Sequence, residues 1–71
     1  MTNSLIINGK QKRFPAHQLP GTLGELLEKM NIQAATVAAE IDGRIIERKN
    51  FADTNLQPGQ SIELIRFVGG G

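Results

Sequence analysis

A single amphipathic helix limits what the rest of this chain can fold into. Between residues 22 and 30, apolar side chains recur at helical spacing and form one stripe, which consists of Leu23, Leu26, Leu27 and Met30. Thr22 and Glu25 have the spacing of a capping box, which predicts that the helix begins here. Because one helix covers only one face of a sheet, the chain is expected to form two layers, a helix on a sheet.

Two tight-turn dipeptides predict β-hairpins on either side of this helix. Asn8-Gly9 and Asp42-Gly43 each follow a short β-type run, and both pairs tolerate the positive φ angles of a two-residue turn. Strands are expected over residues 4–8, 11–14, 36–41, 44–47 and 61–68. The first and last strands are expected to form a parallel central pair, with the helix in the connection between them. The predicted fold class is therefore α+β with a mixed sheet.

The chain has 71 residues and no cysteine, which restricts how it can be stabilised. Disulfides, thiolate zinc sites and cysteine nucleophiles are excluded, and a reducing, cytoplasmic location is favoured. Apolar packing must then hold the fold, although a chain of this length buries only about 60% of its unfolded surface. Phe51 and Leu56 are predicted to fill the core beneath an irregular connection over residues 48–57.

No catalytic constellation and no metal site are predicted. His17 is the only histidine, so both Ser-His-Asp chemistry and histidine metal ligation would depend on one side chain. A net charge of +1 with interspersed signs, together with the lack of Trp and Tyr, argues against nucleic acid as a partner. No apolar run approaches the roughly 20 residues that cross a bilayer, so membrane insertion is not expected.

The chain ends in Val68-Gly69-Gly70-Gly71. Because they lack Cβ atoms, Gly70 and Gly71 can enter an enzyme slot that is too narrow for other residues. The terminal carboxylate presented there is an anion and a poor electrophile, so another protein would have to activate it, for example by transfer to the α-phosphate of ATP. We expect a domain over residues 1–68 and a flexible tail over residues 69–71. The alternative is a frayed end without a function.

The last strand predicts an apolar surface beside this tail. If Ile62 and Leu64 point into the core, period-two alternation places Ile65 and Phe67 on the opposite face, where polar residues are normally expected. Exposed apolar patches commonly mark partner sites. The alternative is that the loop carrying Phe51 covers this second face. The predicted partner-binding patch consists of Ile6, Ile65, Phe67 and Val68.

Several segments together resemble the ThiS family of thiamine-biosynthesis sulfur carriers. They are the capped helix Thr22-Leu-Gly-Glu-Leu-Leu27, the segment Val37-Ala-Ala-Glu-Ile-Asp-Gly-Arg-Ile-Ile-Glu-Arg48, the turn Pro58-Gly59 and the ending Ile62-Glu-Leu-Ile-Arg-Phe-Val-Gly-Gly-Gly71. The resemblance covers nearly the whole chain. It implies a β-grasp, ubiquitin-like fold, with a mixed sheet of about five strands and one main helix packed on one face.

The resemblance also implies that this chain is a protein co-substrate and not an enzyme. In the family, a ThiF-like adenylyltransferase uses ATP and magnesium to adenylate the terminal glycine, here Gly71, and a sulfur-delivery protein then converts it to a thiocarboxylate. A ThiG-like thiazole synthase receives the sulfur. Gly70 supplies the slender approach, while Gly69 stands where relatives often have alanine, which leaves the glycine pair intact. No cofactor is expected on this chain itself.

Two other functions stay open at this point. The small subunit of molybdopterin synthase shares the fold and the diglycine end, but it usually has a longer chain and a proline-containing approach to the glycines, which is absent here. A ubiquitin-like modifier or a passive interaction module would use the apolar patch, with a terminus that forms amide bonds or has no role.

Overall fold

The computed structural model describes residues 3–67. This range contains five strands, one α-helix and two short 3₁₀-helices. The elements in chain order are β1 (Ser4–Ile7), β2 (Lys10–Arg13), α1 (Leu23–Lys29), η1 (Ala34–Thr36), β3 (Val37–Ile41), β4 (Arg44–Ile46), η2 (Arg48–Asp53) and β5 (Ser61–Arg66). The predicted tail Gly69, Gly70 and Gly71, together with Val68, lies outside the described residues.

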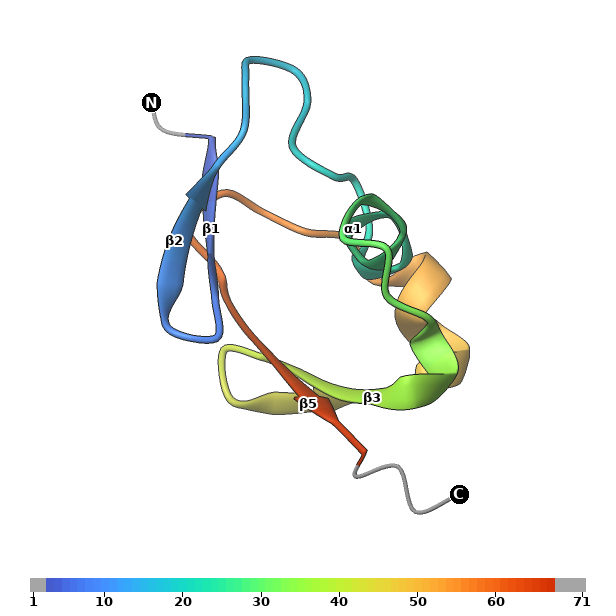
Figure 1. The fold of residues 1–71 in the computed structure, drawn as a ribbon. Helices are drawn as coiled ribbons and strands as arrows, with labels where there is room; N and C mark the ends of the chain where they lie inside the picture. The colour runs from blue at the N-terminus through green and yellow to red at the C-terminus, as the bar shows by residue number, and fades with distance from the viewer. Residues whose placement is uncertain (1–2, 68–71) are drawn as a thin grey trace.

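The strands form one mixed sheet in the order β2-β1-β5-β3-β4. β1 and β5 run parallel at its centre, with Ile7 opposite Ile62, and the other neighbouring strands are antiparallel. The predicted parallel central pair is therefore confirmed. α1 lies in the connection between these two strands and packs on one face of the sheet (Figure 1), so the two-layer prediction is also correct.

Both hairpins turn at the dipeptides that the sequence indicated. The φ angles are 51° at Asn8 and 81° at Gly9, and they are 49° at Asp42 and 85° at Gly43. Two consecutive positive φ angles match the right-handed twist of the flanking strands, and asparagine, aspartate and glycine adopt them most readily. β2 begins one residue earlier than expected, directly after the turn, and β5 ends at Arg66.

The start of α1 is fixed by two hydrogen bonds. Thr22 Oγ1 accepts a bond of 3.2 Å from the backbone N–H of Glu25, as the capping box predicts. The Glu25 carboxylate in turn accepts from the backbone N–H of Gly21 at 3.2 Å, one residue before the cap. The side chains of Thr22 and Glu25 therefore each accept a hydrogen bond from a backbone N–H near the helix start.

The core lies between α1 and the inner face of the sheet. Leu23, Leu26 and Leu27 are buried on the predicted stripe, and Met30 packs against the core while partly exposed. The strands contribute Leu5, Ile7, Val37, Ala39, Ile41, Ile62 and Leu64. All of these strand positions share one face because side chains alternate along a strand.

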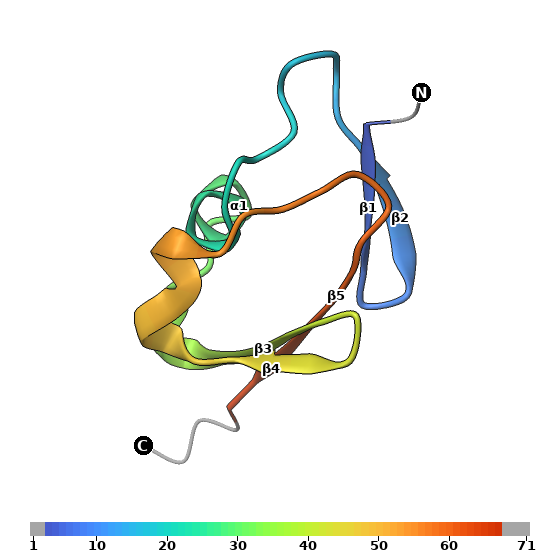
Figure 2. The ribbon, with the colours of Figure 1, turned by 180° about the vertical axis from the view of Figure 1, so that it is seen from behind.

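The connection over residues 48–57 is more regular than expected. Phe51 and Leu56 are buried, which confirms their predicted role in the core, but residues Arg48–Asp53 form η2. η2 lies beside α1 (Figure 2). A Cβ atom added at Gly24 would lie 3.4 Å from Ala52 Cα, so the backbones of α1 and η2 pack closely at this point.

Candidate partner-docking surface

β5 divides its side chains between the core and the outer face of the sheet, which is the face turned away from α1. Ile62 and Leu64 are buried, whereas Ile65 is 52% exposed and Phe67 is 56% exposed. Both are exposed as predicted, and Ile65 lies on the outer face opposite Ala38. The alternative, that the loop carrying Phe51 covers the second face, is wrong at Ile65, because this side chain is half exposed.

Ile6 also lies on the outer face and is 37% exposed. On β1 it stands opposite Ser61, at the start of β5, whereas Ile65 lies four residues further along that strand. At a rise of about 3.3 Å per residue the two side chains are about 13 Å apart along β5. Glu63 occupies the outer face between them. The isoleucines are thus on one surface without being adjacent.

The sequence reasoning missed Ile45, which is the most exposed large apolar side chain of the described residues at 77%. On β4 it stands opposite Glu40, and Glu40 stands opposite Glu63 on β5. Ile45 therefore lies on the same outer face as Ile65. The sequence carries no clear signal for it, because Ile45 and Ile46 are adjacent isoleucines and only the structure shows that Ile46 packs partly against the core.

Phe67, the last residue that the structure describes, is held against Thr36, the last residue of η1. Its backbone N–H donates to the carbonyl oxygen of Thr36 at 2.9 Å. The side chain borders two shallow depressions, one that includes Ala38 and Arg48 and another that includes Ile32 and Arg66. The backbone of Phe67 is therefore anchored just beyond the end of β5.

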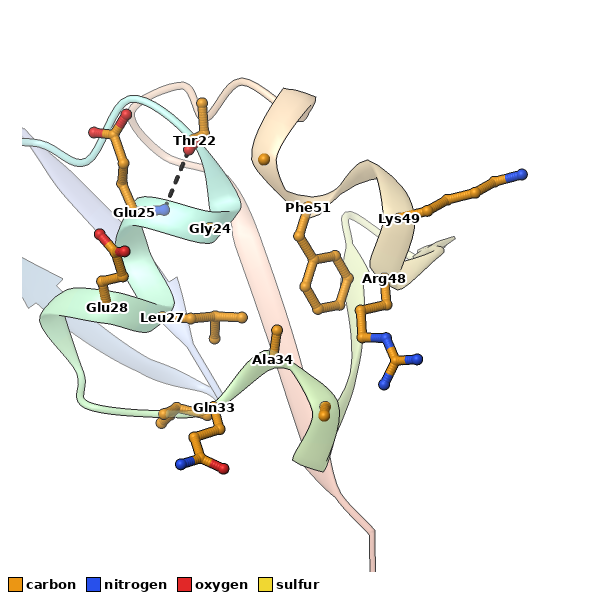
Figure 3. A pocket seen from close by; sticks show the side chains of 13 residues that line it. Thr22, Gly24, Glu25, Leu27, Glu28, Gln33, Ala34, Arg48, Lys49 and Phe51 are labelled. Atoms are coloured by element: carbon orange, nitrogen blue, oxygen red, sulfur yellow. Dashed lines mark hydrogen bonds between the residues drawn. The ribbon is translucent and has the colours of Figure 1, made fainter.

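A separate groove lies in the helix layer, between α1 and the two 3₁₀-helices (Figure 3). Phe51 points toward Leu27 and Ala34 and forms its apolar floor, as Figure 3 shows. Glu28 stands on the α1 side, and Arg48 stands on the η2 side. The Glu25 carboxylate and the Thr22 hydroxyl at one end are already engaged in the helix cap.

His17 is exposed in the loop between β2 and α1, with a φ angle of 67°. In residues 3–67, no three His, Cys, Asp or Glu side chains are grouped so that they could hold a metal ion. None of the helices in that range is long and apolar enough to cross a membrane. The features that point to a function are therefore the outer face of the sheet and the glycines that follow it in the sequence.

Comparison with known protein families matches residues 5–71 to the ThiS family. The chain belongs to the ThiS family of thiamine-biosynthesis sulfur carrier proteins. The match includes Gly69, Gly70 and Gly71, and the resemblance seen in the sequence is confirmed.

The fold agrees with solved ThiS structures. A crystal structure of the thiamine biosynthesis protein ThiS from Geobacter metallireducens is 32% identical to this chain, with a TM-score of 0.80 over 96% of this chain and 99% of that one. A solution structure of a thiamine biosynthesis protein from the same organism is 32% identical, with a TM-score of 0.77 over 96% and 87% of the two chains. The predicted β-grasp fold, a mixed five-stranded sheet with one main helix, is thus confirmed.

A curated relative is much longer than this ThiS-family chain. A thiazole synthase from Paramagnetospirillum magneticum is 30% identical over 67 residues, which cover 94% of this chain and 20% of the relative. This chain therefore spans about a fifth of the length of the relative it matches.

Proposed function

We propose that this chain carries sulfur as a thiocarboxylate on Gly71 and delivers it for formation of the thiazole ring of thiamine. A ThiF-like adenylyltransferase, using ATP and magnesium, would activate the carboxylate, and a sulfur-delivery protein would supply the sulfur. A ThiG-like thiazole synthase would accept it. The observation that carries the proposal is the ThiS-family match over residues 5–71, because it includes the glycines that the chemistry requires.

The chemistry needs a partner for each step. A carboxylate oxygen of Gly71 would attack the α-phosphorus of ATP, and pyrophosphate would leave. A sulfur nucleophile would then attack the carbonyl carbon of the acyl-adenylate, and AMP would leave with the electrons of the broken carbon–oxygen bond. This chain contributes its terminus and its docking surface, while Gly70 and Gly69 have no Cβ atoms to obstruct a narrow active-site slot.

The length of the tail limits where the partners can bind. Residues 68–71 follow Phe67, and four residues span at most about 14 Å even when fully extended. A partner whose active site receives Gly71 must therefore contact the surface around Phe67. Ile65, which is half exposed on the outer face near that point, supports a docking role for Ile65 and Phe67. The part of Ile6, about 13 Å from Ile65 along β5, and of Val68, outside the described residues, stays a prediction.

The thiazole synthase relative supports the identity of the sulfur acceptor. In that protein a segment similar to this chain is part of the same polypeptide as the remainder of a thiazole synthase. A covalent link raises the effective concentration of one partner for the other, which is useful when two surfaces must meet in every reaction cycle. We accordingly assign a thiazole synthase as the acceptor for this chain.

High-resolution mass spectrometry of the C-terminal fragment tests the proposal. The protein is incubated with ATP and an extract of its source cells, and the replacement of one oxygen by sulfur is measured on a fragment that begins after Met30, so that oxidation of Met1 or Met30 does not contribute to the mass. We expect a thiocarboxylate on Gly71 and none on a chain that lacks Gly71. An unmodified carboxylate in an extract that converts a known carrier would contradict the proposal. Binding to the large subunit of molybdopterin synthase, and not to thiazole synthase, would contradict the pathway.

A further inference from the structure

Two carboxylates face each other across the outer face of the sheet. Glu40 on β3 and Glu63 on β5 are direct cross-strand partners, so their Cβ atoms lie about 4.5–5.5 Å apart. Neither forms an ion pair within residues 3–67, where the ion pair that is present joins Lys49 and Glu47. Like charges directly opposite one another destabilise a sheet. The fold therefore retains an unfavourable pair on an exposed surface.

The arginines that neighbour this acidic pair belong to other parts of the sheet. Arg44 stands opposite Ile41 and Arg66 stands opposite Val37, so both occupy positions whose partners face the core. Arg13 shares the outer face, but it is on β2, opposite Ser4 of β1, and β2 is two strands away from β5. Within residues 3–67, none of these three arginines forms an ion pair with Glu40 or Glu63.

Exposed isoleucines flank the acidic pair. Ile45 stands beside Glu40 on the neighbouring strand, and Ile65 lies two residues beyond Glu63 on the same face of β5. Both are more than half exposed. A carboxylate pair between two apolar side chains is complementary to a cation that is itself flanked by apolar groups, as at the centre of many protein interfaces.

We propose that Glu40 and Glu63, together with Ile45 and Ile65, bind an arginine-bearing surface of the adenylyltransferase. This inference rests on the proposed function. The planar guanidinium group carries five N–H donors, so one arginine can donate to both carboxylates at once, which a single ammonium group does less well. Glu63 lies on β5 four residues before Phe67, which follows the strand, and this places the pair within the footprint that a partner of the tail must cover.

Charge favours this partner over a second copy of the chain and over nucleic acid. A second copy of the chain would present the same acidic pair, and the two faces would repel each other. The phosphates of nucleic acid would be repelled in the same way. An enzyme that binds ATP, by contrast, commonly places arginine and lysine side chains around the phosphates, and the resulting positive potential attracts an acidic face and steers its approach.

Steady-state kinetics with the ThiF-like adenylyltransferase of the same organism test this inference. Carrier-dependent release of pyrophosphate from ATP is measured against carrier concentration, at low and at physiological salt, for the wild type and for the double variant Glu40→Gln/Glu63→Gln. We expect the KM for the double variant to rise about tenfold at low salt with kcat unchanged, and its KM to vary less with salt, because the lost contacts act on binding and not on Gly71.

A control with the same change in net charge separates the local effect from the global one. Glu25→Gln/Glu28→Gln removes two exposed carboxylates from α1, in the helix layer, and glutamine can still accept the hydrogen bond from Gly21 at the helix start. We expect this variant to keep the wild-type KM. An equal rise in KM for both double variants would overturn the inference, because net charge alone would then account for the effect.

The remaining outcomes distinguish this inference from the proposed function. If the wild type releases pyrophosphate but Glu40→Gln/Glu63→Gln has the same KM, this inference fails and the proposed function stands. If the wild type itself supports no release, both fail. The single variants Glu63→Lys and Glu63→Gln identify the charge of the partner. Against an opposing arginine the KM should be higher for Glu63→Lys than for Glu63→Gln, and an equal KM for the two would exclude an arginine. Thermal unfolding of each variant verifies that it is folded.

Discussion

The side chain of Asn8 joins the first hairpin to the central strand, because its Oδ1 accepts a hydrogen bond of 2.8 Å from the backbone N–H of Leu64. The two residues are 56 positions apart in sequence. Asn8 also adopts a φ angle of 51°, and its own backbone N–H donates to the carbonyl oxygen of Ile62 at 2.9 Å. One residue therefore closes the turn and extends the contact between β1 and β5.

Replacing Asn8 should reveal these two roles separately. Asn8→Gly keeps the positive φ angle and removes only the side-chain bond, so we expect a loss of about 1 kcal/mol in the free energy of unfolding. Asn8→Ala adds a conformational penalty of about 1 kcal/mol. Chemical denaturation of both variants separates the contribution of the side-chain hydrogen bond from that of the positive φ angle. Identical midpoints for Asn8→Gly and Asn8→Ala would show that the backbone conformation contributes nothing.

Close packing between α1 and η2 predicts a size limit at Gly24. Glycine in a helix is less stable than alanine by about 0.5–1 kcal/mol, and a Cβ atom at this position would meet Ala52 Cα at 3.4 Å, near the limit of ordinary contact. We expect Gly24→Ala to be neutral or to stabilise the protein by up to about 0.5 kcal/mol. Gly24→Val should destabilise it by about 1–3 kcal/mol, because its γ-methyl groups have no space. A comparison of their unfolding midpoints checks this order, and equal stability of the two would contradict close packing.

The opposition of Glu40 and Glu63 predicts that one substitution stabilises the fold. Glu63→Gln removes the like-charge pair and keeps the shape of the side chain, so the free energy of unfolding should increase by about 0.2–1 kcal/mol at low salt. Salt screens exposed charges, so the gain should shrink as ionic strength rises. Thermal denaturation over a salt series measures both effects. Glu28→Gln, which lacks a cross-strand carboxylate, serves as the control, and a gain in that variant of the same size would contradict the explanation.

Local patterns predicted the elements, whereas the relationships between distant strands required the structure. Asn8-Gly9 and Asp42-Gly43 fix the hairpins through their own backbone preferences, and Thr22 fixes the helix start, so each could be read from a few adjacent residues. The parallel central pair followed from connectivity. The register of β3 on β5, which brings Glu40 to Glu63, depends on residues more than 20 positions apart and has no local signature.

For the candidate site too, some residues could be predicted from local patterns and others required the structure. Ile65 and Phe67 were found because alternation along one strand is a local property. Ile45 was missed because a three-residue edge strand offers too few positions to establish which side faces the core. The roles of Gly69, Gly70 and Gly71 come from the sequence and the family match, and they stay predictions because these residues lie outside the described range.

Because Ile65 is exposed on the outer face, we expect its substitution to affect partner binding more than folding stability. The side chain is 52% exposed and stands opposite Ala38, so Ile65→Asp removes little buried area, and we expect unfolding to become easier by no more than about 1 kcal/mol. Leu64→Ala, the matched change at the adjacent core position, should destabilise the fold by about 2–5 kcal/mol.

Binding to the adenylyltransferase, measured by titration calorimetry on folded protein, should weaken at least about tenfold for Ile65→Asp, because a new carboxylate in an apolar contact must be desolvated. Leu64→Ala should bind with nearly wild-type affinity once the unfolded fraction is subtracted. If Ile65→Asp instead lost as much stability as Leu64→Ala and bound normally, the residue would belong to the core and the outer face would have no docking role.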